Sequence, residues 1–116
     1  MQFLSDGEIY KVVRITGPTH NFLGLAFMQP KTNGIVSVEP ITMNAGEIVR
    51  LRADEVREQV MEGIKEANAE LGANYHPRRI QFVPSDSTPV EIYRMLAKRI
   101  IQRLHTEPES YQGTVD

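Results

Sequence analysis

The stretch YHPRRIQFVPSDSTPVEIYRMLAKRIIQRL, residues 75–104, decides the fold. Alternating apolar side chains over 79–83 predict a strand. A polar loop follows. Thr88, Pro89 and Glu91 then have the spacing of a helix start, with a threonine cap, a proline in the first position and a capping-box glutamate. We therefore expect a strand, a loop and a second helix that starts at the threonine.

This second helix has a wide apolar face that covers about 180° of its circumference. Its apolar residues are Ile92, Tyr93, Leu96, Ala97, Ile100, Ile101 and Leu104. Contact with a flat sheet alone needs a narrower stripe. The width predicts that the helix packs against the sheet and also against a second body, either the first helix or another subunit.

The first helix is predicted to begin with Asp54 as its N-cap and to end at Gly72, which suits a left-handed terminal position. Its apolar residues recur every three or four positions and fall within an arc of about 80°. They are Val56, Val60, Ile64, Ala67 and Leu71. Glutamates occupy the other faces. The pattern predicts a helix that rests on a core by one narrow stripe and has an acidic outer surface.

The N-terminal half is rich in β-branched and aromatic residues, which predicts strands. We expect them over 8–16, 20–28 and 35–41, with a short one over 47–51. Asn33 and Gly34 both tolerate positive φ and predict a tight hairpin between the second and third strands, and 43–46 reads as a turn. The expected core comprises Val13, Ile15, Leu23, Leu25, Phe27, Val56, Val60, Ile64, Leu71, Phe82, Leu96, Ile100 and Leu104.

The order of these elements favours an α+β fold over a parallel, doubly wound sheet, because strands come first and helices later. We expect a single domain over 1–105, with a mostly antiparallel sheet of four or five strands and two helices packed on one face. The segment 106–116 is polar and acidic and has no apolar periodicity. It is predicted to be a flexible tail, with Tyr111 as a possible anchor.

Composition places the chain among ordinary globular proteins. It has 116 residues, a charged share of 24% and no cysteine, so disulfides and thiolate metal sites are excluded. The N-terminal residues lack the pattern of a signal peptide, and no apolar run is long enough to span a membrane. We expect a cytoplasmic protein of bacterial type.

Charge is distributed in blocks along the chain, with a net charge of −4 over 53–74 and +4 over 75–104. The second helix carries a cationic face made of Arg94, Lys98, Arg99 and Arg103, and Met95 projects among these cations. The cations are compatible with a solvated face or with pairing to the acidic first helix. Methionine among arginines is also typical of protein interfaces. Nucleic acid is disfavoured, because the isoelectric point is near 5.9 and no aromatic residues alternate with the basic ones.

The loop before the second helix is an alternative site. Ser85, Asp86 and Ser87, with Arg79 as countercharge, are candidates to hold a small anion, a nucleotide or a carboxylate at the helix N-terminus. The loop lacks the glycines of a phosphate-binding loop, and its aspartate would repel an anion. The simpler interpretation is a turn followed by a helix cap.

Catalytic and metal-binding patterns are absent from the sequence. The three histidines share no metal-ligand spacing, and no nucleophile motif occurs. Two hypotheses follow. The first is a non-enzymatic protein-binding module, such as an adaptor, an inhibitor or an immunity-type protein, that uses Arg94, Met95, Lys98 and Arg99. The second is an anion-binding protein or minor enzyme that uses the Ser85–Thr88 loop. Neither requires a metal or a cofactor.

Overall fold

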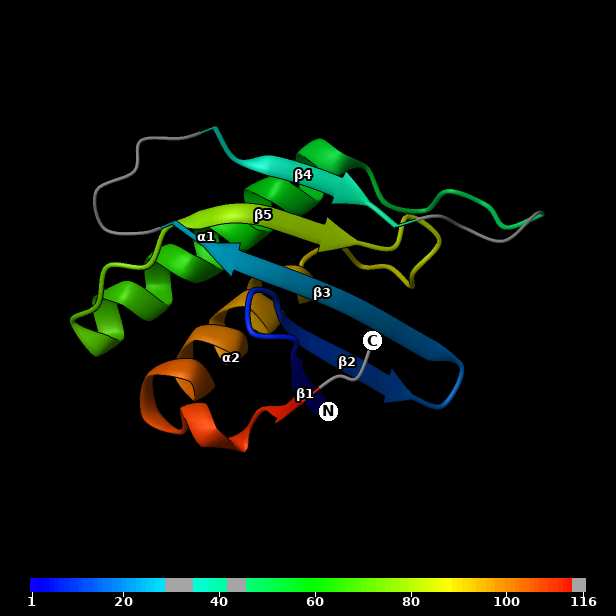
Figure 1. The fold of residues 1–116 in the computed structure, drawn as a ribbon. Helices are drawn as coiled ribbons and strands as arrows, with labels where there is room; N and C mark the ends of the chain where they lie inside the picture. The colour runs from blue at the N-terminus through cyan, green and yellow to red at the C-terminus, as the bar shows by residue number, and fades with distance from the viewer. Residues whose placement is uncertain (29–34, 42–45, 114–116) are drawn as a thin grey trace.

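One mixed sheet organises the fold. The computed structural model describes residues 1–28, 35–41 and 46–113. They form a six-stranded sheet with the order β4-β5-β3-β2-β1-β6, together with two α-helices (Figure 1). The strands are β1 (Gln2–Ser5), β2 (Tyr10–Thr16), β3 (Thr19–Phe27), β4 (Ser37–Pro40), β5 (Pro77–Phe82) and β6 (Gln112–Gly113).

The α+β class is confirmed, but the sheet differs in detail from the prediction. Strands β1, β2, β3 and β5 pair antiparallel, whereas β4 pairs parallel to β5 and β6 pairs parallel to β1. The prediction of four or five mostly antiparallel strands therefore did not include β1 and β6. Both are short, with four residues in β1 and two in β6, too few to show a clear alternation.

Strand β5 lies between β3 and β4 in the sheet, although it follows both in the sequence. The predicted hairpin through Asn33 and Gly34 is therefore wrong in its pairing, because the strands that it would join are not neighbours. These two residues lie outside the described part of the chain, as does most of the predicted turn over 43–46.

The fourth strand predicted over 47–51 is also wrong, because this segment joins no ladder of the sheet. The backbone N–H groups of Arg50 and Leu51 instead donate to the carbonyl oxygen of Pro84, at 2.8 and 3.0 Å. The side chain of Leu51 is buried. Of the apolar residues that suggested a strand, Leu51 thus anchors the segment that leads from β4 to the first helix.

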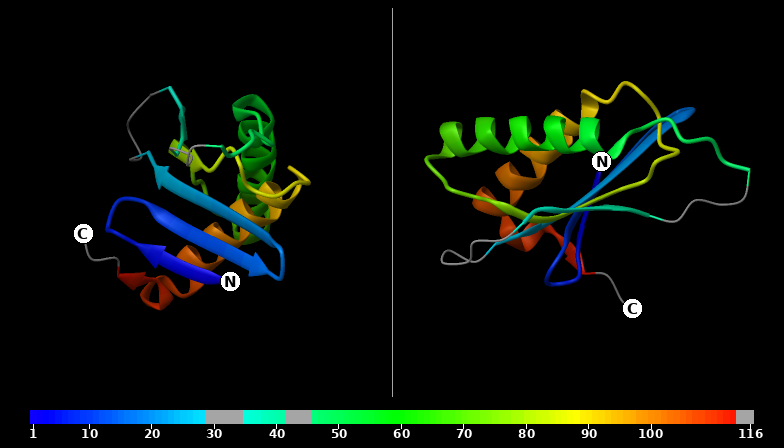
Figure 2. Two further views of the ribbon diagram at one scale, coloured as in Figure 1. Left: turned by 90° about the vertical axis from the view of Figure 1, so that its right-hand side faces the viewer. Right: turned by 90° about the horizontal axis from the view of Figure 1, so that it is seen from above.

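Two helices, α1 (Ala53–Leu71) and α2 (Ile92–Thr106), lie on one face of the sheet and pack against each other (Figure 2). The wide apolar arc of α2 is explained by α1, which supplies the second body. Helix α1 ends at Gly72 with φ 62°, as predicted. Its N-cap is Arg52 rather than Asp54, which lies in the first turn, where a carboxylate favours the helix dipole.

Helix α2 starts later than predicted. Its first residue is Ile92 and its N-cap is Glu91, with no side-chain cap. The chain enters the helix through a tight turn in which the N–H of Ile92 donates to the carbonyl of Pro89, at 3.3 Å. The predicted cap at Thr88 is therefore wrong, because a short turn separates the threonine from the helix.

The core lies between the sheet and the helices. One row of cross-strand partners contributes the buried residues Phe3, Val12, Leu23 and Phe82. On β2 the predicted register was wrong. Val12 is fully buried, whereas Val13 is half-buried and Ile15 is 69% exposed. Both apolar alternations of this strand are plausible in sequence, so only the partners decide which one faces the core.

The segment predicted to be a flexible tail packs against the domain as far as Gly113, the last residue that the structure describes. After α2 come a short 3₁₀ helix (Pro108–Ser110) and then β6, which pairs with β1. Tyr111 is the anchor: its hydroxyl donates to the carbonyl of Ile100 at 2.6 Å, and its ring packs edge-on against that of Phe3. Burial raises the pKa of this tyrosine.

Candidate functional site

The two cations of α2 nearest to α1 are neutralised within the chain. The Nε of Arg94 donates to Glu66 at 3.0 Å, and the guanidinium makes a second, ionic contact with the same carboxylate. Lys98 Nζ lies 2.6 Å from Glu70 Oε1. The arginine holds the pKa of Glu66 below its usual value. The structure thus supports the pairing of this face with the acidic first helix for two of the four predicted partner-binding residues.

A close crossing of the helices makes these pairs possible. A Cβ placed on Gly63 would lie 2.2 Å from the carbonyl oxygen of Arg94 and 3.1 Å from the Cβ of Ala97. Only glycine fits at this point, so the axes approach closely and bring the acidic row of α1 alongside the basic row of α2.

Met95 and Arg99 lie next to Lys98 on the surface of α2. Together with Lys98 and Gln102 they line a surface hollow of about 370 Å³. The methionine is half-buried and the arginine is exposed. Among the described residues, Arg99 has no ion-pair or hydrogen-bond partner. The methionine also packs against the edge of the hydrophobic core. The structure therefore divides the predicted set into two residues that are paired internally, one half-buried methionine and one exposed arginine without a partner.

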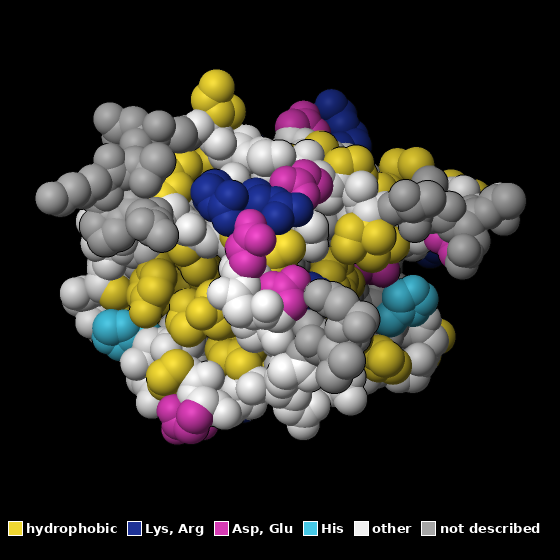
Figure 3. Space-filling model, viewed as in Figure 1, with side chains coloured by type: hydrophobic (Ala, Val, Ile, Leu, Met, Phe, Trp, Pro, Cys, Tyr) yellow, Lys and Arg dark blue, Asp and Glu magenta, His cyan; other side chains and the backbone are white. Residues whose placement is uncertain are grey.

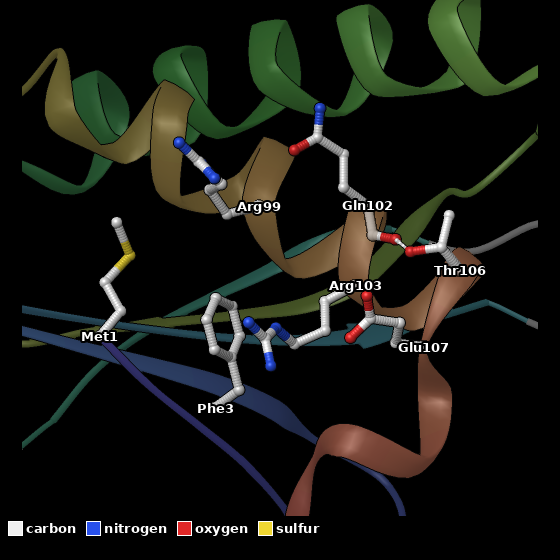
Figure 4. Close-up of a pocket in the computed structure, with 7 residues that line it drawn as sticks. All are labelled: Met1, Phe3, Arg99, Gln102, Arg103, Thr106 and Glu107. Atoms are coloured by element: carbon white, nitrogen blue, oxygen red, sulfur yellow. Dashed lines mark hydrogen bonds between the residues drawn. The ribbon is translucent and has the colours of Figure 1, made fainter.

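A second hollow, of about 400 Å³, adjoins the first and shares Arg99 and Gln102 with it. Its remaining lining comes from both ends of the described chain, as Figure 4 shows: Met1, Phe3, Arg103, Thr106 and Glu107. The guanidinium of Arg103 lies over the Phe3 ring, 4.1 Å from its centre. Sequence reasoning included this arginine in the cationic face but missed the N-terminal side of the hollow, because pairing of β1 with β2 could not be inferred from four residues.

The loop at Ser85–Ser87 has a structural role. Asp86 is only 2% exposed, and its Oδ2 accepts hydrogen bonds from the N–H of Phe22 at 2.6 Å and the hydroxyl of Tyr93 at 3.1 Å. Ser85 Oγ donates to Glu47, and Ser87 Oγ accepts from the N–H of His20. These contacts hold the loop against β3 and α2. The hydroxyls of Ser85 and Ser87 both already take part in hydrogen bonds.

His20, Asp86 and Ser87 lie close together but do not form a catalytic triad. The imidazole Nε2 of His20 is 3.7 Å from Asp86 Oδ1, whereas the serine hydroxyl bonds to the backbone of the histidine and not to its ring. A triad needs the base beside the hydroxyl that it activates. Burial raises the pKa of Asp86. The cluster is therefore a structural link between β3 and the loop.

Arg79, the fourth residue of the alternative site, is not near the loop hydroxyls. Its guanidinium makes two hydrogen bonds of 2.8 Å to Glu39 of β4 and one of 3.1 Å to Glu8. Arg78 also contacts Glu8. Figure 3 shows basic side chains over β5 with acidic ones directly beside them, on the face of the sheet opposite the helices. The structure therefore does not bring the four residues of the anion-site hypothesis together.

The ion pairs of Arg79 with Glu39 and Glu8 predict that part of the folding stability is lost at acid pH. The hydrogen bonds from Arg79 lower the pKa of Glu39 from 4.5 to about 2. Because the unfolded chain binds this proton more readily, the stabilisation is present above pH 4.5 and is lost as the pH falls towards 2. Urea unfolding at a series of pH values should show Glu39→Gln with a shallower loss of stability below pH 4.5 than the unsubstituted chain. The control, Glu58→Gln, alters an exposed residue of α1 that has no hydrogen bond or ion pair among the described residues and should follow the unsubstituted curve. Equal slopes for all three proteins would contradict the role of Glu39.

Within residues 1–28, 35–41 and 46–113, no group of three or more His, Asp or Glu side chains is arranged to hold a metal ion. None of the helices in this part of the chain combines the length and apolarity needed to cross a membrane. Comparison with protein-family models, with curated proteins and with solved structures finds no significant match to this chain. The site must therefore be interpreted from its own residues.

Proposed function

We propose that this chain is a non-enzymatic protein-binding module and that it binds an acidic segment of a partner protein through the exposed side of α2. We call this area the α2 surface and define it by Met95, Arg99, Gln102, Arg103 and Thr106. The observation that carries the proposal concerns Arg99, which lines both adjoining hollows, and Arg103, which lines the larger one. Neither arginine has a carboxylate partner among the described residues. Arg94 and Lys98, which already have such partners, are assigned to stability.

The chemistry of the α2 surface favours a peptide. Arginine and methionine are typical of interface centres, because the guanidinium binds carboxylates in a fork geometry and the thioether adapts to apolar side chains. Acidic residues border the surface on both sides, with Glu70 of α1 on one and Glu107 on the other. Such borders would repel a wide polyanion such as nucleic acid and leave room for a narrow acidic segment. The absence of cysteine supports a reducing, cytoplasmic setting.

A peptide-display experiment tests this function. A library of random peptides selected on the immobilised full chain should enrich sequences that combine Asp or Glu with apolar residues. Binding of the enriched peptides should weaken by about tenfold or more in Arg99→Glu, because one attractive charge becomes repulsive. The matched control is Arg57→Glu, an exposed arginine on α1 that is not part of the α2 surface.

Circular dichroism and thermal unfolding serve to check that both variants are folded before binding is compared. Enrichment of basic or uncharged peptides would contradict the proposal. So would acidic peptides that bind Arg99→Glu as tightly as the unsubstituted chain, since the α2 surface would then not be the place where they bind.

A further inference from the structure

We infer that the hollow between the C-terminal half of α2 and strand β1 is a carboxylate subsite, which takes a single carboxylate together with the apolar side chain next to it. This inference rests on the proposed function, because it assigns one part of the partner peptide to one part of the α2 surface. It goes further by specifying the charge of the ligand and the arginine that binds it.

Arg103 is the residue that we expect to bind the carboxylate. Its guanidinium lies 4.1 Å from the centre of the Phe3 ring, a distance at which the ring attracts the cation. The ring is itself held in place, since Phe3 is only 9% exposed and contacts Tyr111 edge-on at 5.8 Å between ring centres. An arginine restrained in this way loses less side-chain entropy when it binds a carboxylate.

The charges of the lining favour a monoanion. Among the side chains of the lining, Arg99 and Arg103 contribute two positive charges and Glu107 contributes one negative charge, a net side-chain charge of +1. No ion pair joins Arg103 to Glu107 in the structure, so the arginine is not neutralised by its neighbour. A single carboxylate balances the charge of these side chains, whereas a phosphate dianion exceeds it and would be repelled by the glutamate.

The shape and polarity of the hollow add the apolar requirement. A volume of about 400 Å³ falls in the range of small-ligand sites, which is more than a carboxylate alone fills. Met1, 56% exposed, lies on the wall opposite the helix (Figure 4). The hydroxyl of Thr106 already donates to the carbonyl of Gln102 at 2.7 Å. The side-chain amide of Gln102 donates to Glu70 at 3.3 Å. The free donors among the lining side chains are thus mainly the two guanidinium groups, and an exposed apolar side chain lies beside them.

The inference is tested by titrating the ¹⁵N-labelled full chain with N-acetylleucine while the backbone amides and the Nε–H signal of Arg103 are followed by NMR. We expect saturable shifts at Arg103, Arg99 and Thr106, with a Kd in the millimolar range. N-acetylleucine amide lacks the carboxylate, acetate lacks the apolar group and inorganic phosphate carries more charge. Each should bind about tenfold more weakly. No saturable shift with N-acetylleucine, or equal affinity for its amide, would overturn the inference.

Two sources can supply this chemistry in a protein: a C-terminal carboxylate after an apolar residue, and an internal Asp or Glu beside one. A short peptide that ends in leucine with a free carboxylate is compared with an amidated peptide that carries an internal Glu-Leu pair. Binding of either one to the Arg103 region supports the subsite and identifies the source. Binding of neither overturns it.

Variants separate a binding role from a structural one. Arg103→Gln should abolish the shifts caused by N-acetylleucine, and Arg103→Lys should weaken them by about tenfold although it keeps the charge, because an ammonium lacks the planar fork. Phe3→Leu removes the ring over which the Arg103 guanidinium lies and should therefore weaken binding, although both arginines are unchanged in this variant. Arg57→Gln should change nothing. Unaltered binding in folded Arg103→Gln would overturn the role of this arginine.

Failure of the subsite and failure of the proposed function give different results. If acidic peptides bind in an Arg99-dependent way but N-acetylleucine does not bind near Arg103, the subsite is wrong and the protein-binding function stands. If N-acetylleucine binds as described and the display selects no acidic peptide, the subsite stands as a small-carboxylate site and the peptide function is wrong.

Discussion

Gly63→Ala is expected to lower the free energy of unfolding by about 3 kcal/mol, the upper part of the usual range for overpacking. The added methyl would lie 2.2 Å from the carbonyl oxygen of Arg94, which is backbone and cannot rotate away. The helices would have to separate, and the ion pair between Arg94 and Glu66 would weaken with them. The gain of about 1 kcal/mol from the higher helix propensity of alanine is too small to offset this cost. Chemical denaturation followed by circular dichroism measures the change.

Two further variants make this test specific. Gly72→Ala adds a methyl at the left-handed end of α1, where no atom lies within 4 Å, and should cost only about 1 kcal/mol of backbone strain. Ala97→Gly removes the side-chain contact but not the carbonyl, so it should fail to restore stability in the Gly63→Ala background. Full rescue by Ala97→Gly, or a cost at Gly63 no larger than at Gly72, would show that the backbone contact does not limit the approach of the helices.

Asp86→Ala is expected to destabilise the protein by about 3–5 kcal/mol, because two donors lose the same acceptor. The N–H of Phe22 and the hydroxyl of Tyr93 both donate to Oδ2, and the carboxylate is almost completely buried. An unsatisfied buried donor typically costs about 1–3 kcal/mol, and bonds to a charged acceptor lie at the upper end of that range. Equilibrium unfolding in urea provides the measurement.

Asp86→Asn is the matched control. Since both donors use one oxygen, an amide oxygen in the same place can accept both bonds, so the loss should be about 1 kcal/mol, the difference between a charged and a neutral acceptor. Tyr93→Phe removes one donor together with its bond and should also cost about 1 kcal/mol. An alanine variant no less stable than the asparagine variant would refute the role of Asp86 as a shared acceptor.

The helices were predictable because their apolar residues repeat over several turns. In α1 the stripe of Val56, Val60, Ile64 and Ala67 is buried as expected, and the terminator at Gly72 has the expected conformation. Their ends were less predictable. Thr88, Pro89 and Glu91 have the right spacing for a capping box, but Asp86 fixes the loop to β3 and α2 begins after a further turn. A long-range contact overrides a local signal of about 1 kcal/mol.

The sheet was predictable only in part, because strand pairing depends on residues far apart in the sequence. Either Val12 or Val13 can face a core, and the choice depends on Leu23 and Phe3 in the neighbouring strands. The candidate site shows the same limit. The basic face of α2 is evident from spacing, but its division into paired and unpaired cations depends on the crossing at Gly63, which the sequence does not reveal.

The position of β5 between β3 and β4 has a consequence for how the chain acquires its structure during synthesis. Strands β1, β2 and β3 can pair as soon as they leave the ribosome, yet the outer edge of β3 has no partner until residues 77–82 emerge. Strand β3 carries the buried Leu23, Leu25 and Ala26, so a nascent chain presents an apolar strand with an open edge for about 50 residues of translation. Strand β4 cannot join the sheet before β5 does, because its only sheet partner among the described strands is β5. Strand β5 therefore fills the interior of the sheet late in synthesis, and a ribosome pause between residues 28 and 77 prolongs exposure of an aggregation-prone edge.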